Sequence, residues 1–187
     1  MVSPQHVLQQ IHDTHPSNTH CYPLGYVNTL YSLARSVDAR RVLEVGVGPR
    51  GLSGRAFVLA MGTGGQLTSV EINPNHPEPD VLPHKFAAQY GCSWRIMYGD
   101  SKALGMTFAR AWYDIVFIDG DHARAAAEAD WEKYSPYARP GGLIIVDDYG
   151  PAYPEVREVI DNLKLDGHEF TFVDYVSPNG LVWTKAK

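Results

Sequence analysis

The chain has 187 residues, of which 44% are apolar and 20% charged, values typical of a single soluble globular domain. A formal net charge of −5 argues against a general binder of phosphate backbones, so we expect no nucleic-acid partner. Two cysteines without a CxxC pair argue against a thiolate zinc site or a disulfide framework. The polar N-terminus and the lack of a long apolar run predict a cytoplasmic protein with no membrane partner.

The N-terminal segment, residues 1–38, is expected to act as a cap on a larger core. One helical pattern runs from Tyr26 to Val37, and a His- and Pro-rich stretch precedes it. We expect the helix to pack on a sheet and the stretch before it to cover a site. Residues 39–187 are then predicted to form a Rossmann-like core in the same domain.

Short apolar runs alternate with helical patterns through the rest of the chain. The early runs lack polar–apolar alternation, which fits strands buried on both faces of a parallel sheet. The alternation predicts βαβ units and an α/β, doubly wound sheet, and an Asn-Gly pair at 179–180 predicts a terminal antiparallel hairpin. The predicted strands are 41–45, 66–72, 93–98, 113–119, 142–148, 169–175 and 181–185, and the helices 52–61, 122–137 and 154–164.

A glycine-rich turn joins the first predicted strand to the helix that follows it. In VLEVGVGPRG, the spacing of Gly46, Gly48 and Gly51 matches the dinucleotide-binding pattern and lets a ligand approach the backbone closely. Glu71 ends the next strand, where a carboxylate can accept hydrogen bonds from both ribose hydroxyls. These residues predict an adenosine cofactor without separating NAD from others.

Two acids favour a cofactor that carries a positive centre. Glu44 lies two residues before Gly46, where it would repel a pyrophosphate but suit an amino group and a cation. Asp100, in the GDS that follows the third strand, is placed to accept a hydrogen bond from an adenine amino group.

The motifs EVGVGPRG, VEIN, GDS, YDIVFIDGDH and PGGLIIVDD, in this order across residues 41–148, resemble class I S-adenosylmethionine-dependent methyltransferases. The resemblance implies a doubly wound, seven-stranded, mostly parallel sheet with an antiparallel last strand. It also implies S-adenosyl-L-methionine as cofactor. The cofactor-binding positions that it implies are Glu44, Gly46, Gly48, Gly51, Glu71, Ile72, Asp100, Ser101 and Asp119.

Four acids follow the fourth and fifth strands, namely Asp119, Asp121, Asp147 and Asp148. Since parallel strands end at one edge of the sheet, these carboxylates would crowd together and repel unless a cation or protons neutralise them. Hard oxygen ligands suit Mg²⁺ or a similar divalent ion. Capping of the following helices is an alternative role for the same acids.

The acid pattern also resembles the cation-dependent O-methyltransferases of the catechol and caffeoyl-coenzyme A type. The resemblance implies a divalent cation, Mg²⁺ or another, held by Asp119, Asp147 and Asp148, although Asp148 stands where the family has Asn. The form FIDGDH is similar to a bacterial group of small methyltransferases related to cephalosporin hydroxylase and macrolide sugar O-methyltransferases.

His122 lies three residues after Asp119, where catechol-type enzymes place a lysine base. A histidine titrates near neutrality and suits proton removal from a hydroxyl. We therefore predict methyl transfer to a hydroxyl of a small molecule, with His122 and Asp119 catalytic. A non-catalytic cofactor binder, a metal-independent N- or carboxyl-methyltransferase and an NAD-type oxidoreductase stay open, and a homo-oligomer is an open expectation.

The segment 73–85 carries four prolines where the family ordinarily has a helix after its second strand. Two interpretations stay open for it, a stiff flap over the adenosine and a plain insertion.

Overall fold

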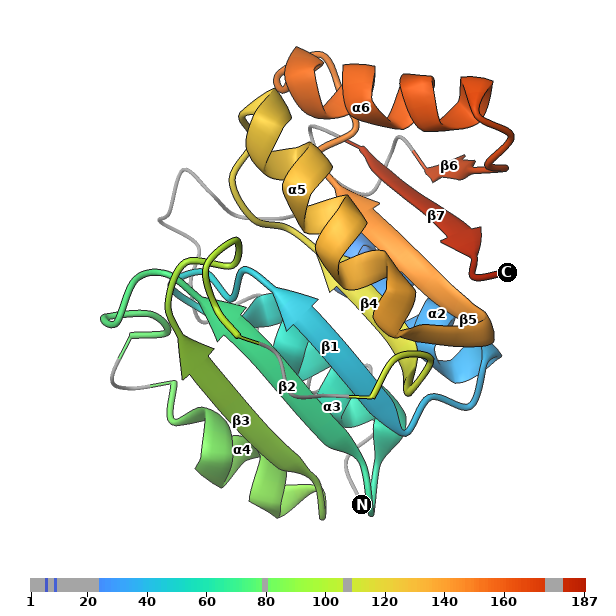
Figure 1. Ribbon diagram of the computed structural model, residues 1–187. Helices are drawn as coiled ribbons and strands as arrows, with labels where there is room; N and C mark the ends of the chain where they lie inside the picture. The colour runs from blue at the N-terminus through green and yellow to red at the C-terminus, as the bar shows by residue number, and fades with distance from the viewer. Residues whose placement is uncertain (1–5, 7–8, 10–23, 79–80, 106–108, 174–179) are drawn as a thin grey trace.

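The computed structural model describes residues 6, 9, 24–78, 81–105, 109–173 and 180–187. They form three layers, with one sheet between two groups of helices (Figure 1). The strands are β1 (Arg41–Val45), β2 (Gln66–Glu71), β3 (Ser93–Tyr98), β4 (Tyr113–Ile118), β5 (Ala138–Asp147), β6 (Thr171–Val173) and β7 (Leu181–Lys185). The helices are α2 (Leu24–Ser36), α3 (Leu52–Met61), α4 (Pro83–Gln89), α5 (Arg124–Tyr134), a short 3₁₀ helix η1 (Ser135–Tyr137) and α6 (Pro154–Leu165).

The sheet has seven strands in the order β3-β2-β1-β4-β5-β7-β6. Strands β1 to β5 pair in parallel, whereas β7 runs antiparallel to both β5 and β6. This confirms the predicted doubly wound sheet with an antiparallel last strand. The antiparallel pairing of β6 with β7 also confirms the terminal hairpin, although its turn at 174–179 lies outside the described residues.

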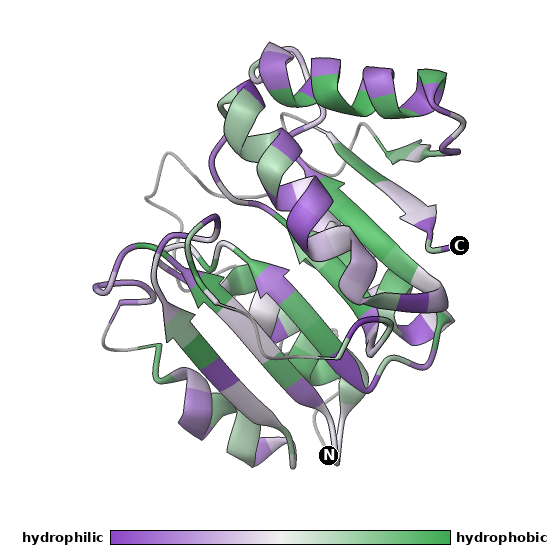
Figure 2. Ribbon diagram, in the orientation of Figure 1, coloured by the Kyte–Doolittle hydropathy of each residue, from purple (hydrophilic) through white to green (hydrophobic). Residues whose placement is uncertain are grey.

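The sheet is buried on both faces. Helices α2, α3 and α4 cover one face, where Leu30 and Phe57 are fully buried. Helices α5 and α6 cover the other, where Tyr134 and Ile160 pack against the strands. Every residue of β4 is buried, and Figure 2 shows apolar residues gathered along the central strands. Two-sided burial explains why the predicted strands lacked polar alternation.

Two elements differ from the sequence-based expectation. Helix α4 begins at Pro83, inside the segment 73–85 that was predicted as a loop. Strand β5 begins at Ala138, four residues before its predicted start at 142, and its pairing with β4 shifts register. Of the predicted cap 1–38, the described part is chiefly α2, which packs against α3. Residues 10–23, which hold the His- and Pro-rich stretch expected to cover a site, lie outside the described residues. None of the helices within the described ranges has the length and apolar character that a membrane crossing requires.

Candidate active site

A pocket of about 340 Å³ lies at the carboxyl edge of β1, β2, β3 and β4. This is the edge where open α/β sheets bind ligands, and the volume is that of a small-molecule site. The pocket brings together most of the residues predicted to bind a cofactor, whereas Glu44 and Gly51 lie outside its lining. The predicted residues that line it are Gly46, Gly48, Glu71, Ile72, Asp100, Ser101 and Asp119.

Gly46 sits where two strand ends come into close contact. Its φ of 86° lies in the left-handed region, and its N–H donates to the Val70 carbonyl at 2.9 Å. A Cβ built on Gly46 would overlap the carbonyl oxygen of Asp119. Only glycine allows β1 to turn here without pushing β4 away. Gly51, by contrast, precedes α3 and faces the Trp94 ring, so its role is in packing the helix against the sheet.

Glu71 holds the glycine loop from the end of β2. Its Oε2 accepts hydrogen bonds from the backbone N–H groups of Val47 at 3.0 Å and Gly48 at 3.1 Å. Its Oε1 accepts one from the N–H of Asn73 at 2.8 Å. Three N–H donors stabilise the carboxylate in a nearly buried position. The Glu71 side chain is therefore fixed in place where it lines the pocket.

Glu44 faces away from the pocket, toward α3. Successive side chains of a strand point to opposite faces, and Glu44 shares the face of Val42. Its carboxylate is fully buried and accepts hydrogen bonds of 2.5 Å from the hydroxyls of Ser53 and Ser69. Burial raises its pKa to about 7. Among the predicted cofactor-binding acids, Glu71, Asp100 and Asp119 line the pocket and Glu44 does not.

The turn after β3 is held in place by α5. Asp100 Oδ1 accepts a hydrogen bond from the Lys102 N–H at 2.9 Å, which closes the turn. Lys133 donates to the carbonyls of Ser101 and Leu104, and the Tyr134 hydroxyl donates to the Ser101 carbonyl at 2.7 Å. These contacts fix Asp100 and Ser101 at the side of the pocket where adenine was predicted to bind.

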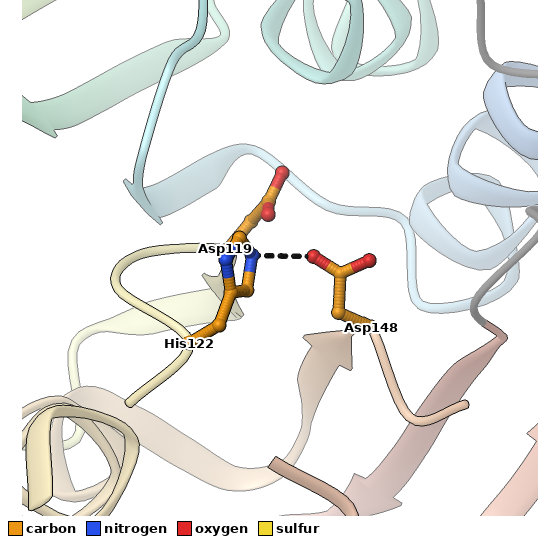
Figure 3. A group of neighbouring side chains, drawn as sticks. All are labelled: Asp119, His122 and Asp148. Carbon is orange, nitrogen blue, oxygen red and sulfur yellow. Dashed lines mark ion pairs between the residues drawn. The ribbon is translucent and has the colours of Figure 1, made fainter. Parts of the chain in front are cut away.

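Three side chains converge where β4 and β5 end: Asp119, His122 and Asp148 (Figure 3). One ligand atom from each lies within 4.8 Å of the others. His122 Nε2 lies 2.6 Å from Asp148 Oδ2, and this contact raises the pKa of the imidazole. Asp148 is buried and has a φ of 63°, an uncommon backbone conformation for a residue other than glycine. That backbone turn directs its carboxylate to His122.

The surroundings of Asp147 and Asp119 disfavour the charged form of both carboxyl groups. Burial and then the neighbouring Asp148 carboxylate raise the pKa of Asp147 to about 8, although the nearby Asp148 backbone and Tyr26 hydroxyl oppose the shift. Burial and the carboxylates of Asp147 and Asp148 raise the pKa of Asp119 well above its usual range. The crowding predicted for this edge is therefore present.

The set of side chains able to hold a metal differs from the predicted one. Among the described residues, the group that could hold a metal ion comprises Asp119, His122 and Asp148, and the predicted ligand Asp147 is not part of it. The raised pKa of Asp119 shows that its surroundings disfavour a charge on this carboxyl group, and a cation held beside it would neutralise that charge. The two carboxylates suit Mg²⁺ or Mn²⁺, which prefer oxygen ligands. The imidazole nitrogen among the donors would also suit Fe²⁺ or Zn²⁺.

Tyr153 is a neighbour of this cluster that the sequence did not single out. Its ring stacks on the His122 imidazole, with centroids 4.0 Å apart and planes at 23°. Tyr153 lies in the segment YGPAYP (149–154), which leads from β5 into α6, and the signal for it was the position of that segment after a strand at the ligand-binding edge. The stack restricts the orientation of the imidazole plane.

Comparison with known proteins gives the same picture. A family model described as "Methyltransferase domain" matches residues 43–149. The catechol O-methyltransferase of Mycobacterium tuberculosis (strain ATCC 25618 / H37Rv) is 34% identical over 121 residues, which cover 62% of this chain and 51% of that protein. The O-methyltransferase from Bacillus cereus, solved in complex with SAH, superposes with a TM-score of 0.71 at 19% identity, covering 100% of this chain and 92% of that one.

A second solved structure, cofactor-bound Rv0187 from MTB, has a TM-score of 0.73 at 21% identity and covers 100% of this chain and 90% of that one. At such identities these two structures establish the fold alone. The chain spans about half the length of the curated relatives that it matches. The family model covers the glycine loop, Glu71 and the acids that follow β4 and β5, and with it the chain belongs to the methyltransferase domain family.

Proposed function

We propose that this protein transfers a methyl group from S-adenosyl-L-methionine to a hydroxyl of a small molecule. One observation carries the proposal. Asp119 belongs both to the lining of the pocket and to the cluster with His122 and Asp148. A cofactor in the pocket would thus lie next to a paired imidazole. The catechol O-methyltransferase relative supports the choice of oxygen as the methyl acceptor.

The pocket fits a sulfonium nucleoside better than a dinucleotide. Four of the described residues that line the pocket are acids, namely Glu71, Asp100, Asp119 and Asp121, and their carboxylates would repel the pyrophosphate of NAD. Glu71, Ile72 and Asp100 line the part suited to ribose and adenine. S-adenosyl-L-methionine, when bound, supplies an electrophilic methyl carbon whose sulfonium leaving group needs no acid.

The chain's own residues provide a base and its orientation. Asp148 holds His122 Nε2, which leaves the other ring nitrogen to take the proton of the acceptor hydroxyl. Asp148 also stabilises the imidazolium that forms, because the two charges are 2.6 Å apart. Tyr153 keeps the ring plane fixed. Holding nucleophile and methyl in line would supply much of the remaining rate acceleration.

A divalent cation is the finer part of the proposal. Asp119 and Asp148 would hold it, with His122 close enough to join them. Such an ion would lower the pKa of the acceptor hydroxyl. The unfavourable charge of the acids around it supports this assignment.

Calorimetry tests the cofactor first. We expect S-adenosylhomocysteine to bind at micromolar strength and NAD to give no heat of binding; the reverse result would reject methyl transfer. Product formation with catechol and related hydroxylated acceptors then tests turnover. Tight binding without methylated product for any acceptor would favour a non-catalytic cofactor binder, and methylation of amines or carboxylic acids alone would reject the O-methyl assignment.

A further inference from the structure

The connection after β2 folds back over the glycine loop instead of extending into solvent. The backbone N–H of Glu78 donates to the Pro49 carbonyl at 2.8 Å, and the Glu78 carboxylate pairs with Arg50 at 2.9 Å. Two contacts of different kinds thus join residues 73–78 to the loop that begins the cofactor pocket.

A third contact anchors the same connection from β3. The Tyr98 hydroxyl donates a 3.0 Å hydrogen bond to the His76 carbonyl, and the His76 N–H donates to the Asn73 carbonyl at 3.0 Å. His76 is therefore fixed by its backbone on both sides, and its position does not depend on its own side chain. Its imidazole is free to face the pocket, where it forms part of the lining.

The His76 imidazole lies beside the carboxylate predicted to bind ribose. Nδ1 is 3.9 Å from Glu71 Oε2, too far for a direct hydrogen bond. The same distance lets one oxygen lie between them, at about 2.8 Å from each. Among the described residues no hydrogen bond engages the ring nitrogens of His76, and 30% of the side chain is exposed.

We infer that His76 is a cofactor-binding residue that acts with Glu71 on a ribose hydroxyl, an inference that rests on the proposed function. A hydroxyl has one proton to donate and lone pairs to accept. It would donate to Glu71, whose Oε2 already accepts two N–H donors, and accept from the imidazole N–H. The Pro-rich connection is then a part of the nucleoside site, which decides between the two interpretations of segment 73–85.

The test compares His76→Ala with His84→Ala, the same change on the exposed surface of α4. Calorimetry would use S-adenosylhomocysteine, 5′-methylthioadenosine, and the 2′-deoxy and 3′-deoxy forms of the latter. We expect His76→Ala to weaken the first two ligands by the same factor, roughly tenfold, because they share the nucleoside. His84→Ala should leave all four unchanged.

The deoxy forms locate the hydroxyl. For the form that lacks it, the wild-type protein and His76→Ala should bind equally. Thermal unfolding should first show that His76→Ala is folded. If the folded variant then binds S-adenosylhomocysteine with the same Kd as the wild-type protein, the inference is overturned and the proposed function stands. The inference is also overturned if His76→Ala weakens the binding of both deoxy forms by the same factor, since His76 would then act on another part of the ligand. If the wild-type protein does not bind S-adenosylhomocysteine, the proposed function fails and the inference with it.

Discussion

The carboxylates on the two sides of the pocket are held in opposite ways. On the glycine-loop side, the Glu71 carboxylate accepts hydrogen bonds from three backbone N–H groups. On the side of β4 and β5, the pKa values of Asp119 and Asp147 are raised, because each is buried beside other carboxylates. The carboxylate on the glycine-loop side thus has its hydrogen-bond donors within the protein. The carboxyl groups of Asp119 and Asp147, on the side of β4 and β5, have no ion-pair partner among the described residues that would neutralise them.

This difference indicates what each side requires from a ligand. Backbone donors stabilise Glu71 without any ligand, so that side should bind the neutral nucleoside by shape and hydrogen bonds. The acids around Asp119 gain stability only when a cation or protons arrive. Changes on the two sides should therefore separate binding from turnover.

Replacing Gly46 by alanine should have the largest effect, because Gly46 joins the two sides. Its Cβ would overlap the Asp119 carbonyl, and its φ of 86° disfavours any side chain. We expect no measurable binding of S-adenosylhomocysteine and a loss of several kcal/mol in the free energy of unfolding, roughly 3–5 kcal/mol. Calorimetry and chemical denaturation measure these two quantities.

Gly48→Ala is the matched control. Gly48 also has a positive φ of 67°, but a Cβ there meets no atom within 4 Å. Only the backbone strain remains, about 1–2 kcal/mol. Equal damage from the two substitutions would mean that strain, and not the contact between β1 and β4, sets the requirement for glycine.

Removal of divalent cations should act on one side alone. With EDTA present, methyl transfer is expected to fall to the background rate and to return with Mg²⁺ or Mn²⁺, because Asp119 and Asp148 lose the charge that neutralises them. Affinity for S-adenosylhomocysteine, measured in the same buffers, should stay constant, since Glu71 needs no cation. Turnover that is indifferent to EDTA would remove the metal from the mechanism.

The sheet could be predicted from sequence because its central strands β4 and β5 carry long apolar runs. All six residues of β4 are buried, and its run YDIVFID has no other plausible place in a soluble fold. Helix α4 could not be predicted, because it has only seven residues, Pro83–Gln89, and Ala87 alone among them is buried. So short a stretch, after a Pro-rich segment, shows no helical period. The early start of β5 was hidden by Pro140-Gly141-Gly142, which resembles a turn.

The candidate site was predictable in its location but not in its orientations. Sequence placed Asp119, Asp147 and Asp148 at one edge, and the structure agrees. It could not show that Asp147 points toward Tyr26 while the φ of 63° at Asp148 turns that carboxylate to His122. The sequence also could not show which face of β1 Glu44 occupies. Neighbouring residues of a strand point to opposite faces, and the Glu44 side chain points into the core instead of the pocket.

His122→Ala should lower kcat by about a hundredfold to ten thousandfold, the usual contribution of a general base. The Kd for S-adenosylhomocysteine should change little, because His122 is not part of the pocket lining. Steady-state kinetics and calorimetry give the two values, with His84→Ala as the exposed control. Equal losses in kcat and in cofactor affinity would assign His122 a structural role. The two sides of the pocket would then not separate cofactor binding from turnover.

Glu44→Gln should give the smallest effect, and only on stability. The folded-state pKa of Glu44 is raised from 4.5 to about 7 by burial, so folding is favoured by the protonated form. Its contribution is fully present below pH 4.5 and is lost as the pH rises toward 7, up to about 3 kcal/mol. Glutamine keeps partners for Ser53 and Ser69 but does not titrate. The free energy of unfolding of the variant should therefore fall less than that of the wild-type protein between pH 5 and about 8.

Glu132→Gln, on the exposed surface of α5, should follow the wild-type curve. Parallel curves for Glu44→Gln and the wild-type protein would show that Glu44 is already ionised at pH 5, and its carboxylate would then belong with the stabilised anion of Glu71.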